Sequence, residues 1–184
     1  MEELSQHIRR LLIDLAWEAI RACLSDKPLP SPGSVEELRQ KRGAFVSLKR
    51  RVNRELRGCI GHTQADLPLG EAVTRAAVAA ATEDNRFAPV TLEELPTLTL
   101  EISVLGPLLP IRPEAVVVGT HGLVVRCQGR SGLLLPQVPG NYGWDRETFL
   151  DYTCRKAGLA PATWRKPECE ILGFAAFVFS DDEA

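Results

Sequence analysis

The sequence predicts an α+β protein with a mainly antiparallel sheet and packed helices. Two observations support this prediction. Residues 4–24 place apolar side chains at helical spacing, whereas most later apolar segments are short and alternate with a period of two. These later segments are joined by short turns, which favour antiparallel pairing, because parallel strands need long crossover connections. The 184 residues suit one domain, or one domain with a small lobe.

The N-terminal part of the chain is expected to form two helices separated by a stiff linker. Residues 4–24 predict an amphipathic helix with one buried stripe. Three prolines and Gly33 then interrupt regular structure. A short helix is predicted over residues 35–40, with Ser34 as its N-cap and Glu37 as its capping-box partner.

A hairpin and a third helix are expected next. Strands are predicted at residues 44–49 and 56–60, and Gly61 closes the second strand. Asp66 is expected to cap a helix that ends near Glu83. The alanine-rich face of this helix predicts that it packs closely against the hairpin.

The second half of the chain is predicted to hold short strands and one more helix. The expected elements are a helical turn at 91–95, a strand at 98–105, a meander at 116–135, a helix from Asp145 or an adjacent residue to Ala157, and a strand at 169–179. The last strand is strongly apolar, which suggests a central position in a sheet. Trp144 and Trp164 are expected to pin the helix to the sheet. Residues 181–183 are expected to form a solvated acidic tail.

Composition indicates an ordinary globular protein. The net charge is −2 and the isoelectric point is near 6.0, so no overall charge attracts nucleic acid or an anionic membrane. One local basic cluster stands out, and its simplest interpretation is a solvated turn; its members are Lys49, Arg50, Arg51, Arg54 and Arg57.

The cysteines and the N-terminus point to a cytoplasmic protein with reduced thiols. The five cysteines are odd in number, scattered, and never spaced as C-x-x-C, which argues against a disulfide framework and against a zinc ribbon. The first residues lack the features of a signal peptide, and no apolar run is long enough to span a membrane. Cys127, Cys154 and Cys169 fall at positions compatible with burial, and no chemical role is expected for them.

The best candidate for chemistry is the stretch from Leu56 to Gly61, followed by His62. In a strand, Arg57 and Cys59 would point to the same face, and a fixed positive charge beside a thiol favours the reactive thiolate. The glycines at 58 and 61 would let a backbone or a ligand approach closely. The alternative is structural: Cys59 would be a buried inert thiol, and Arg57 would pair with a carboxylate.

These residues suggest three kinds of function. In a thiol-based reaction, Cys59 would be the nucleophile or a radical relay, Arg57 would hold the thiolate or an anionic substrate, and His62 would carry a proton. A metal site on Cys59, His62 and His121 is a weaker possibility. No cofactor is expected, since phosphate-binding and dinucleotide-binding loops are missing from the sequence.

The third possibility is a binding module. Arg57, Arg86 and the basic turn could form an edge that recognises anions, with Asn85 and Phe87 lining a groove. The alternative for this loop is that Asn85 and Arg86 only close the end of the preceding helix.

Several of these segments, read in order, carry a resemblance to a known family. The segments are Leu56–Gly61, Asn85–Phe87, Glu101–Leu105, Gly122–Val125, Leu134–Val138, Trp144, Phe149–Leu150, Cys154–Leu159 and Trp164. The chain resembles the AMMECR domain family, also called AmmeMemoRadiSam system protein A. The resemblance covers nearly the whole chain, and the hexapeptide Leu-Arg-Gly-Cys-Ile-Gly is a specific signature. Where the family commonly has a hydroxyl residue after the hexapeptide, this chain has His62.

The resemblance implies a fold and a context. It implies a single two-lobed domain over residues 1–184, with a larger lobe that holds residues 44–105 and a smaller lobe built from parts of the rest. It also implies a component of a modification system acting with a Memo-type protein and a radical-SAM protein, with Cys59 in a substrate-handling site. The alternative is a non-catalytic adaptor that recognises a protein, a nucleotide or a nucleic acid.

Overall fold

The computed structural model describes residues 4–182, which divide into two compact units. The larger unit holds residues 4–105 together with 177–182, and the smaller unit holds residues 106–176. The larger unit therefore includes the N-terminal helix as well as the predicted hairpin. None of the helices in residues 4–182 combines the length and the apolar character that a membrane crossing needs.

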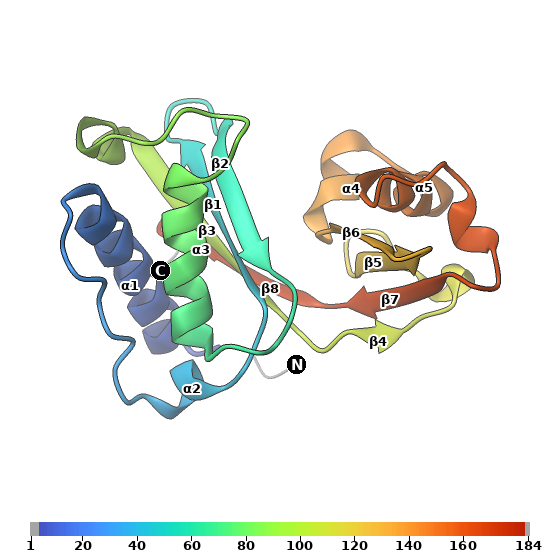
Figure 1. Cartoon of the computed structure of the whole chain (residues 1–184), viewed down its shortest axis with the longest axis horizontal. Helices are drawn as coiled ribbons and strands as arrows, with labels where there is room; N and C mark the ends of the chain where they lie inside the picture. The colour runs from blue at the N-terminus through green and yellow to red at the C-terminus, as the bar shows by residue number, and fades with distance from the viewer. Residues whose placement is uncertain (1–3, 183–184) are drawn as a thin grey trace. The chain divides into compact units, whose positions relative to one another are not determined.

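The larger unit is a four-stranded sheet with two helices on one face (Figure 1). The strands lie in the order β2-β1-β3-β8, and β1 pairs antiparallel with both β2 and β3. α1 and α3 cover the face that presents the alternate apolar residues of β1 and β3, and together they form the main core. The bounds are α1 Gln6–Leu24, α2 Glu36–Arg39, β1 Ala44–Arg50, β2 Leu56–His62, α3 Leu69–Thr82, the 3₁₀ helix Leu92–Thr97, β3 Leu98–Leu105 and β8 Ala176–Ser180.

Two predicted helix caps are wrong. The short helix α2 begins after Val35, not after Ser34, and no side chain caps it. Helix α3 begins after Pro68, so Asp66 does not cap it. The first amide of α3 needs no side-chain cap, because Leu69 N donates a hydrogen bond to the Gln40 carbonyl at 2.9 Å.

The hairpin extends further than predicted, and its two glycines make close packing possible. Gly61 lies inside β2, where a Cβ atom would come within 2.2 Å of the Phe45 ring. A Cβ atom on Gly58 would come within 2.1 Å of the Ala80 carbonyl oxygen. Helix α3 therefore packs directly on β2, as its alanine-rich face predicts.

The smaller unit is a second four-stranded sheet, in the order β4-β7-β5-β6, with a helix packed on it. Its helix α5 begins after Asp145, whose side chain accepts a hydrogen bond from Thr148 N at 2.8 Å, as predicted. Trp164 is buried in this core and Trp144 packs at its edge. The bounds are β4 Leu109–Pro110, the 3₁₀ helix Pro113–Ala115, β5 Gly122–Cys127, β6 Arg130–Leu134, α4 Gln137–Tyr142, α5 Arg146–Lys156, the 3₁₀ helix Thr163–Arg165 and β7 Glu170–Phe174.

Two predicted strands differ from the structure. Residues 116–118 form no strand, because the Val117 N–H donates to Nδ1 of His121 in a local turn instead of joining a ladder. The predicted strand 169–179 is interrupted at the exposed Ala175. Its two parts enter different sheets: β7 lies between β4 and β5, whereas β8 is an edge strand. Only the first part is central.

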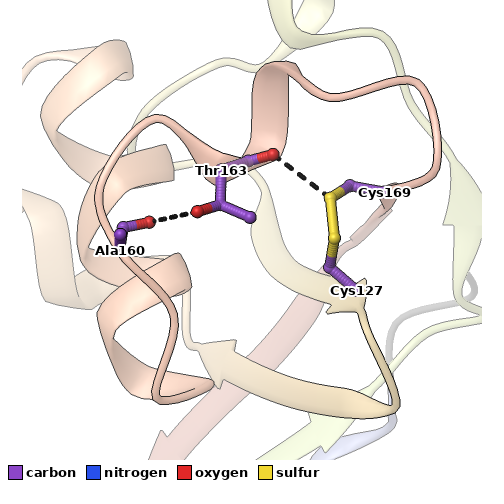
Figure 2. Close-up of a disulfide and its surroundings, with 4 residues drawn as sticks. All are labelled: Cys127, Ala160, Thr163 and Cys169. Carbon is purple, nitrogen blue, oxygen red and sulfur yellow. Dashed lines mark hydrogen bonds between the residues drawn. A yellow bond between two sulfur atoms is a disulfide. The ribbon is translucent and has the colours of Figure 1, made fainter.

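Cys127 and Cys169 form a disulfide, which corrects the prediction that all thiols are reduced (Figure 2). The reason lies in the sheet register. β5 and β7 pair antiparallel with Arg126 opposite Glu170, so Cys127, which follows Arg126, lies opposite Cys169, which precedes Glu170. The two Cα atoms are 4.6 Å apart, within the usual disulfide range. The Thr163 carbonyl oxygen lies 3.1 Å from the Cys169 sulfur.

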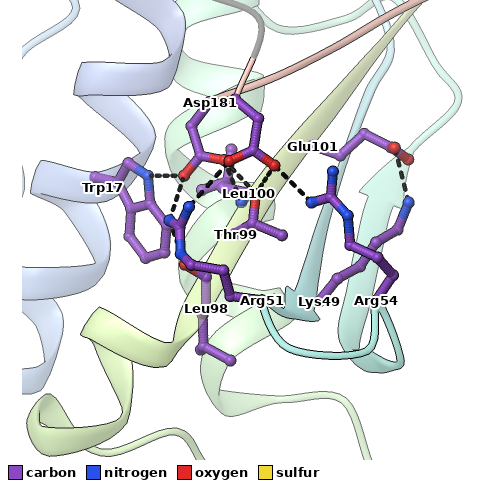
Figure 3. Close-up of polar contacts among 10 residues, drawn as sticks. Trp17, Lys49, Arg51, Arg54, Leu98, Thr99, Leu100, Glu101 and Asp181 are labelled. Carbon is purple, nitrogen blue, oxygen red and sulfur yellow. Dashed lines mark hydrogen bonds and ion pairs between the residues drawn. The ribbon is translucent and has the colours of Figure 1, made fainter.

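The acidic C-terminal segment is not a solvated tail (Figure 3). Asp181 accepts hydrogen bonds from the Trp17 indole N–H, the Thr99 hydroxyl and the Leu100 amide. The next residue, Asp182, pairs with two arginines of the β1–β2 turn, Arg51 at 2.9 Å and Arg54 at 2.6 Å. The tail therefore fastens α1, β3 and the turn to one another. Glu183, also predicted to be solvated, lies outside the described residues.

Candidate functional site

Cys59 lies in the middle of β2, on the sheet face opposite α1 and α3. Its cross-strand neighbour in β1 is Ser47, and Ser47 in turn lies opposite Glu101 in β3. The Ser47 hydroxyl donates a hydrogen bond to Sγ of Cys59 at 3.1 Å. Ser47 is buried and Cys59 is half-buried, so the thiol has restricted access to solvent.

The environment of Cys59 favours the neutral thiol. Burial raises the pKa of Cys59, and the negative charges of Asp84 and Glu101 act in the same direction. The Ser47 hydrogen bond and the positive charge of Arg86 lower this pKa, but by less. At neutral pH the group is therefore S–H, in contrast with the thiolate that the neighbouring arginine in the sequence suggests.

Arg57 is buried, and its guanidinium is bound by other groups of the same chain. Its guanidinium makes a two-pronged ion pair with Glu94, at 2.8 Å from Nε and 3.0 Å from Nη2. Nη2 also donates to the Pro89 carbonyl at 3.4 Å. The same pair lowers the pKa of Glu94. The carboxylate pair that the sequence offers as an alternative role for Arg57 is thus present, and it fastens residues 89–94 to β2.

The charge nearest to the thiol comes instead from the loop after α3. The carboxylate of Asp84 is buried and accepts four hydrogen bonds. One comes from the Cys59 amide at 2.8 Å, and three come from Arg86, through its amide at 3.2 Å, Nε at 2.8 Å and Nη2 at 2.6 Å. These bonds hold the pKa of Asp84 well below its usual range, mainly through the Arg86 guanidinium. Asp84 thus ties the loop to the backbone of the hexapeptide.

Phe87 lies beside both guanidiniums of the site. The central carbon of Arg86 is 5.4 Å from the ring centroid, and that of Arg57 is 5.9 Å away. Arg86 and Asn85 are exposed, whereas Phe87 is half-buried. The loop therefore presents one cation, one amide and part of one aromatic ring to solvent.

Sequence reasoning missed Asp84 and Glu94, the two carboxylates that organise this site. For Asp84 a signal existed: an aspartate at a helix end, followed two residues later by arginine, can accept from that residue's backbone amide. Glu94 carried no such signal, because its partner lies 37 residues away in the sequence.

His62 does not lie beside the thiol. His62 is opposite Ala44, a core residue, so it is on the other face of β2 from Cys59. Its Nε2 lies 3.5 Å from Asp66, and both side chains are exposed. His121 belongs to the smaller unit. Within residues 4–182, no group of three His, Cys, Asp or Glu side chains is arranged to hold a metal ion.

A polar hollow lies on the same sheet. It has a volume of about 320 Å³, and its lining includes Lys49, Thr99 and Glu101. Lys49 and Glu101 form an ion pair at 2.7 Å. Because Glu101 and Cys59 flank Ser47 from opposite sides, the hollow and the thiol lie on one surface. The hollow can bind a polar group, but Cys59 is not among the residues that line it.

Comparison with known proteins identifies relatives over nearly the whole chain. The AMMECR1 family model matches residues 13–179. Protein MK0488 of Methanopyrus kandleri is 42% identical over 191 residues, which covers 99% of this chain and 92% of that protein. Protein PH0010 of Pyrococcus horikoshii is 42% identical over 182 residues, covering 93% and 88%.

A solved structure confirms the α+β fold. The crystal structure of the uncharacterized protein PH0010 matches with a TM-score of 0.88 and 41% identity, over 94% of this chain and 90% of that one. The family model and these relatives span most of the sequence. The chain belongs to the AMMECR1 family.

Proposed function

We propose that this protein is a component of a modification system, acting with a Memo-type protein and a radical-SAM protein, and that its Cys59 site handles the substrate. The partnership is what the resemblance to the AMMECR domain family implies. One structural observation carries the proposed site: the Cys59 thiol accepts a hydrogen bond from a buried hydroxyl, and the Cys59 amide donates to an aspartate that pairs with an arginine.

In this proposal Cys59 works as S–H. A thiol is a weak nucleophile when it is protonated, and burial keeps this one protonated at neutral pH. The proposal therefore assigns Cys59 a substrate contact and no nucleophilic step. Arg86, half-exposed and next to Phe87, would bind an anionic or planar part of the substrate.

The protonation state is tested by the pH dependence of alkylation. The protein is treated with iodoacetamide at several pH values, and each thiol is followed by peptide mass spectrometry. Cys59 should react slowly, with an apparent pKa above the free-thiol value of about 8.5. Cys23 is the matched control, because it is also free and half-buried. Faster reaction at Cys59 than at Cys23 below pH 8 would contradict the protonated thiol.

The role of the site is tested with the two proposed partners. The three proteins are produced together, and the cells are searched by mass spectrometry for products that require all three. Cys59→Ser should lose the product while keeping the fold, whereas Cys23→Ser should keep both. Full product formation by Cys59→Ser would refute the Cys59-centred site, and a lack of any product that depends on this chain would refute the system itself.

A non-catalytic binding module is the second candidate. It is favoured by one observation: Arg57 and Asp84 are buried and committed to internal ion pairs, which leaves Asn85, Arg86 and part of the half-buried Phe87 ring facing solvent. In that case Phe87→Ala should weaken binding to the partner proteins, measured by calorimetry, while Cys59→Ser should leave it unchanged. The opposite pattern would favour the substrate-handling site.

A further inference from the structure

Three aromatic rings stack on one another in the smaller unit, far in sequence from the hexapeptide. The ring centroids of Tyr142 and Trp144 are 5.0 Å apart with an angle of 17° between planes. Those of Trp144 and Tyr152 are 4.0 Å apart with an angle of 16°. The guanidinium carbon of Arg155 lies 4.9 Å from the Tyr152 ring. Tyr142 ends α4, Trp144 precedes α5, and Tyr152 lies within it.

Core packing does not account for this stack. Trp144 touches the edge of the small core, as expected of a residue that pins a helix. Tyr142, by contrast, is 68% exposed and Tyr152 is 38% exposed. Large aromatic rings in solvent lose the burial that normally stabilises them. The two tyrosines therefore extend a flat apolar surface from the core edge into water.

Cations lie beside this surface. Arg155 and Lys156 follow Tyr152 by three and four residues on α5, so they share its side of the helix. Among residues 4–182, no carboxylate lies within ion-pair distance of these two side chains.

The carboxylates of the same segment are already engaged. Asp145 caps α5 and Glu147 pairs with Arg165 at 2.9 Å. Asp151 accepts hydrogen bonds from the Trp164 indole and from the Ala162 amide, each at 2.7 Å. The positive charge beside the rings is thus available to an external anion.

The net charge of the whole chain does not reveal the excess of positive charge in the smaller unit. Residues 106–176 contain eight Arg and Lys residues against six Asp and Glu residues, a net charge of +2. The rest of the chain contains fourteen basic and eighteen acidic residues, a net charge of −4. The overall value of −2 therefore combines a basic smaller unit with an acidic larger one.

We propose that Tyr142, Trp144 and Tyr152, with Arg155 and Lys156, bind single-stranded nucleic acid. Tyr142 is the exposed end of the stack, and its outer face would stack with a base, while the cations would contact the flanking phosphates. Stacking on aromatic side chains beside a positive track is the general way in which proteins hold single strands without reading their sequence. The proposal is independent of Cys59 and of any modification activity.

The test is a binding titration with the full chain and a fluorescein-labelled twelve-nucleotide oligouridylate, followed by anisotropy at about 50 mM salt. An oligothymidylate of equal length distinguishes RNA from DNA as the preferred strand. Tyr142→Ala should weaken binding by about 5- to 150-fold, the range expected for the loss of one stacked base. Tyr142→Trp, which keeps an aromatic ring at this position, should bind the oligonucleotide as tightly as the native chain does. The control is Leu109→Ala, since Leu109 is 60% exposed in the same unit and carries no ring.

Charge and base contributions are separated by two further measurements. Log K falls linearly with the logarithm of the salt concentration. The double variant Arg155→Gln with Lys156→Gln should make this slope shallower by about 1.4, for two lost phosphate contacts on a single strand. An abasic twelve-mer should bind at least about tenfold more weakly than oligouridylate. Equal binding of the abasic strand would refute stacking. Unchanged affinity of a folded Tyr142→Ala variant, or binding of cello-oligosaccharide but not of either oligonucleotide, would overturn the proposal.

Discussion

The two units hold their sheets together by different means. In the larger unit, α1 and α3 bury one whole face of the sheet, and the other face is crossed by ion pairs such as Lys49–Glu101. In the smaller unit, the core is much smaller and one helix, α5, makes most of the contacts with the sheet. There a disulfide joins the ends of β5 and β7.

This difference follows from size. A small unit buries a lower fraction of its surface, so its core alone leaves little margin of stability, and a covalent link compensates. The larger unit has enough core, and its buried polar groups can serve to hold loops in place. The predictions below act on one means of stabilisation at a time.

Loss of the disulfide should have the largest effect. Cys127→Ser with Cys169→Ser should lower the free energy of unfolding by about 2–4 kcal/mol, because the bridge closes a long loop and restricts the unfolded chain. The sequence separation is 42 residues. The measurement is urea unfolding followed by the fluorescence of Trp164, with Trp17 and Trp144 replaced by phenylalanine.

The effect should be confined to the smaller unit. Hydrogen exchange of β5 and β7 amides should accelerate in the double variant, whereas amides of β1 and β3 should exchange as before. Cys23→Ser is the matched control, since Cys23 is a free thiol of the larger unit. Equal acceleration in both sheets would show that the two units do not differ as described.

Removal of one buried charge in the larger unit should have an intermediate effect. Asp84→Asn keeps the shape of the side chain but loses the ion pair with Arg86, at an expected cost of about 1–3 kcal/mol in the free energy of unfolding. Arg86 is half-exposed, which favours the lower part of this range. Asp66→Asn, at an exposed aspartate, is the control and should have little effect. The measurement is urea unfolding at pH 7.

The same variant makes a prediction about pH. The folded-state pKa of Asp84 is depressed below its unfolded value of about 3.9. Its stabilisation is therefore complete above pH 5 and is lost as the pH falls from about 4 toward the folded-state pKa. The native chain should lose stability in this window, and Asp84→Asn should lose less. Equal acid sensitivity of the two proteins would exclude Asp84 as an important contributor.

Much of the fold could be predicted from the sequence, because local patterns specify it. Periodicity gave the helix α1, the hairpin of β1 and β2, and the strand β3 to within a few residues. The predicted cap at Asp145 or an adjacent residue is found at Asp145, since an N-cap depends only on its near neighbours. The predicted cap of α3 at Asp66 is wrong for the opposite reason: the amide of Leu69 is satisfied by Gln40, which lies 29 residues earlier.

The candidate site shows the same limit: contacts between residues that are distant in the sequence could not be predicted. Alternate positions in the hexapeptide predict that Arg57 acts on Cys59, whereas the structure pairs Arg57 with Glu94, and the positive charge that acts on the thiol is that of Arg86. The disulfide also depends on long-range register, because Cys127 and Cys169 become neighbours only when β5 pairs with β7. A single sequence contains no direct record of such pairings.

The smallest effect is expected at the C-terminal carboxylates, where the two neighbouring aspartates differ in burial. The side chain of Asp182 is 31% exposed and pairs with exposed arginines, whereas that of Asp181 is 12% exposed and accepts the Trp17 indole N–H. Asp182→Asn should therefore destabilise the larger unit less than Asp84→Asn does, and less than Asp181→Asn does. The measurement is the urea midpoint for each variant at low salt.

Salt separates a surface ion pair from a buried hydrogen bond. At about 1 M NaCl the Debye length falls to about 3 Å, so exposed pairs lose most of their attraction while the Trp17–Asp181 hydrogen bond keeps its strength. The difference between the native chain and Asp182→Asn should vanish at this salt concentration, and the loss in Asp181→Asn should persist. If both losses vanished, the C-terminal segment would be held by screened surface charge alone. The larger unit would then owe its stability to its helix-covered core, and the carboxylates of Asp181 and Asp182 would contribute only at low ionic strength.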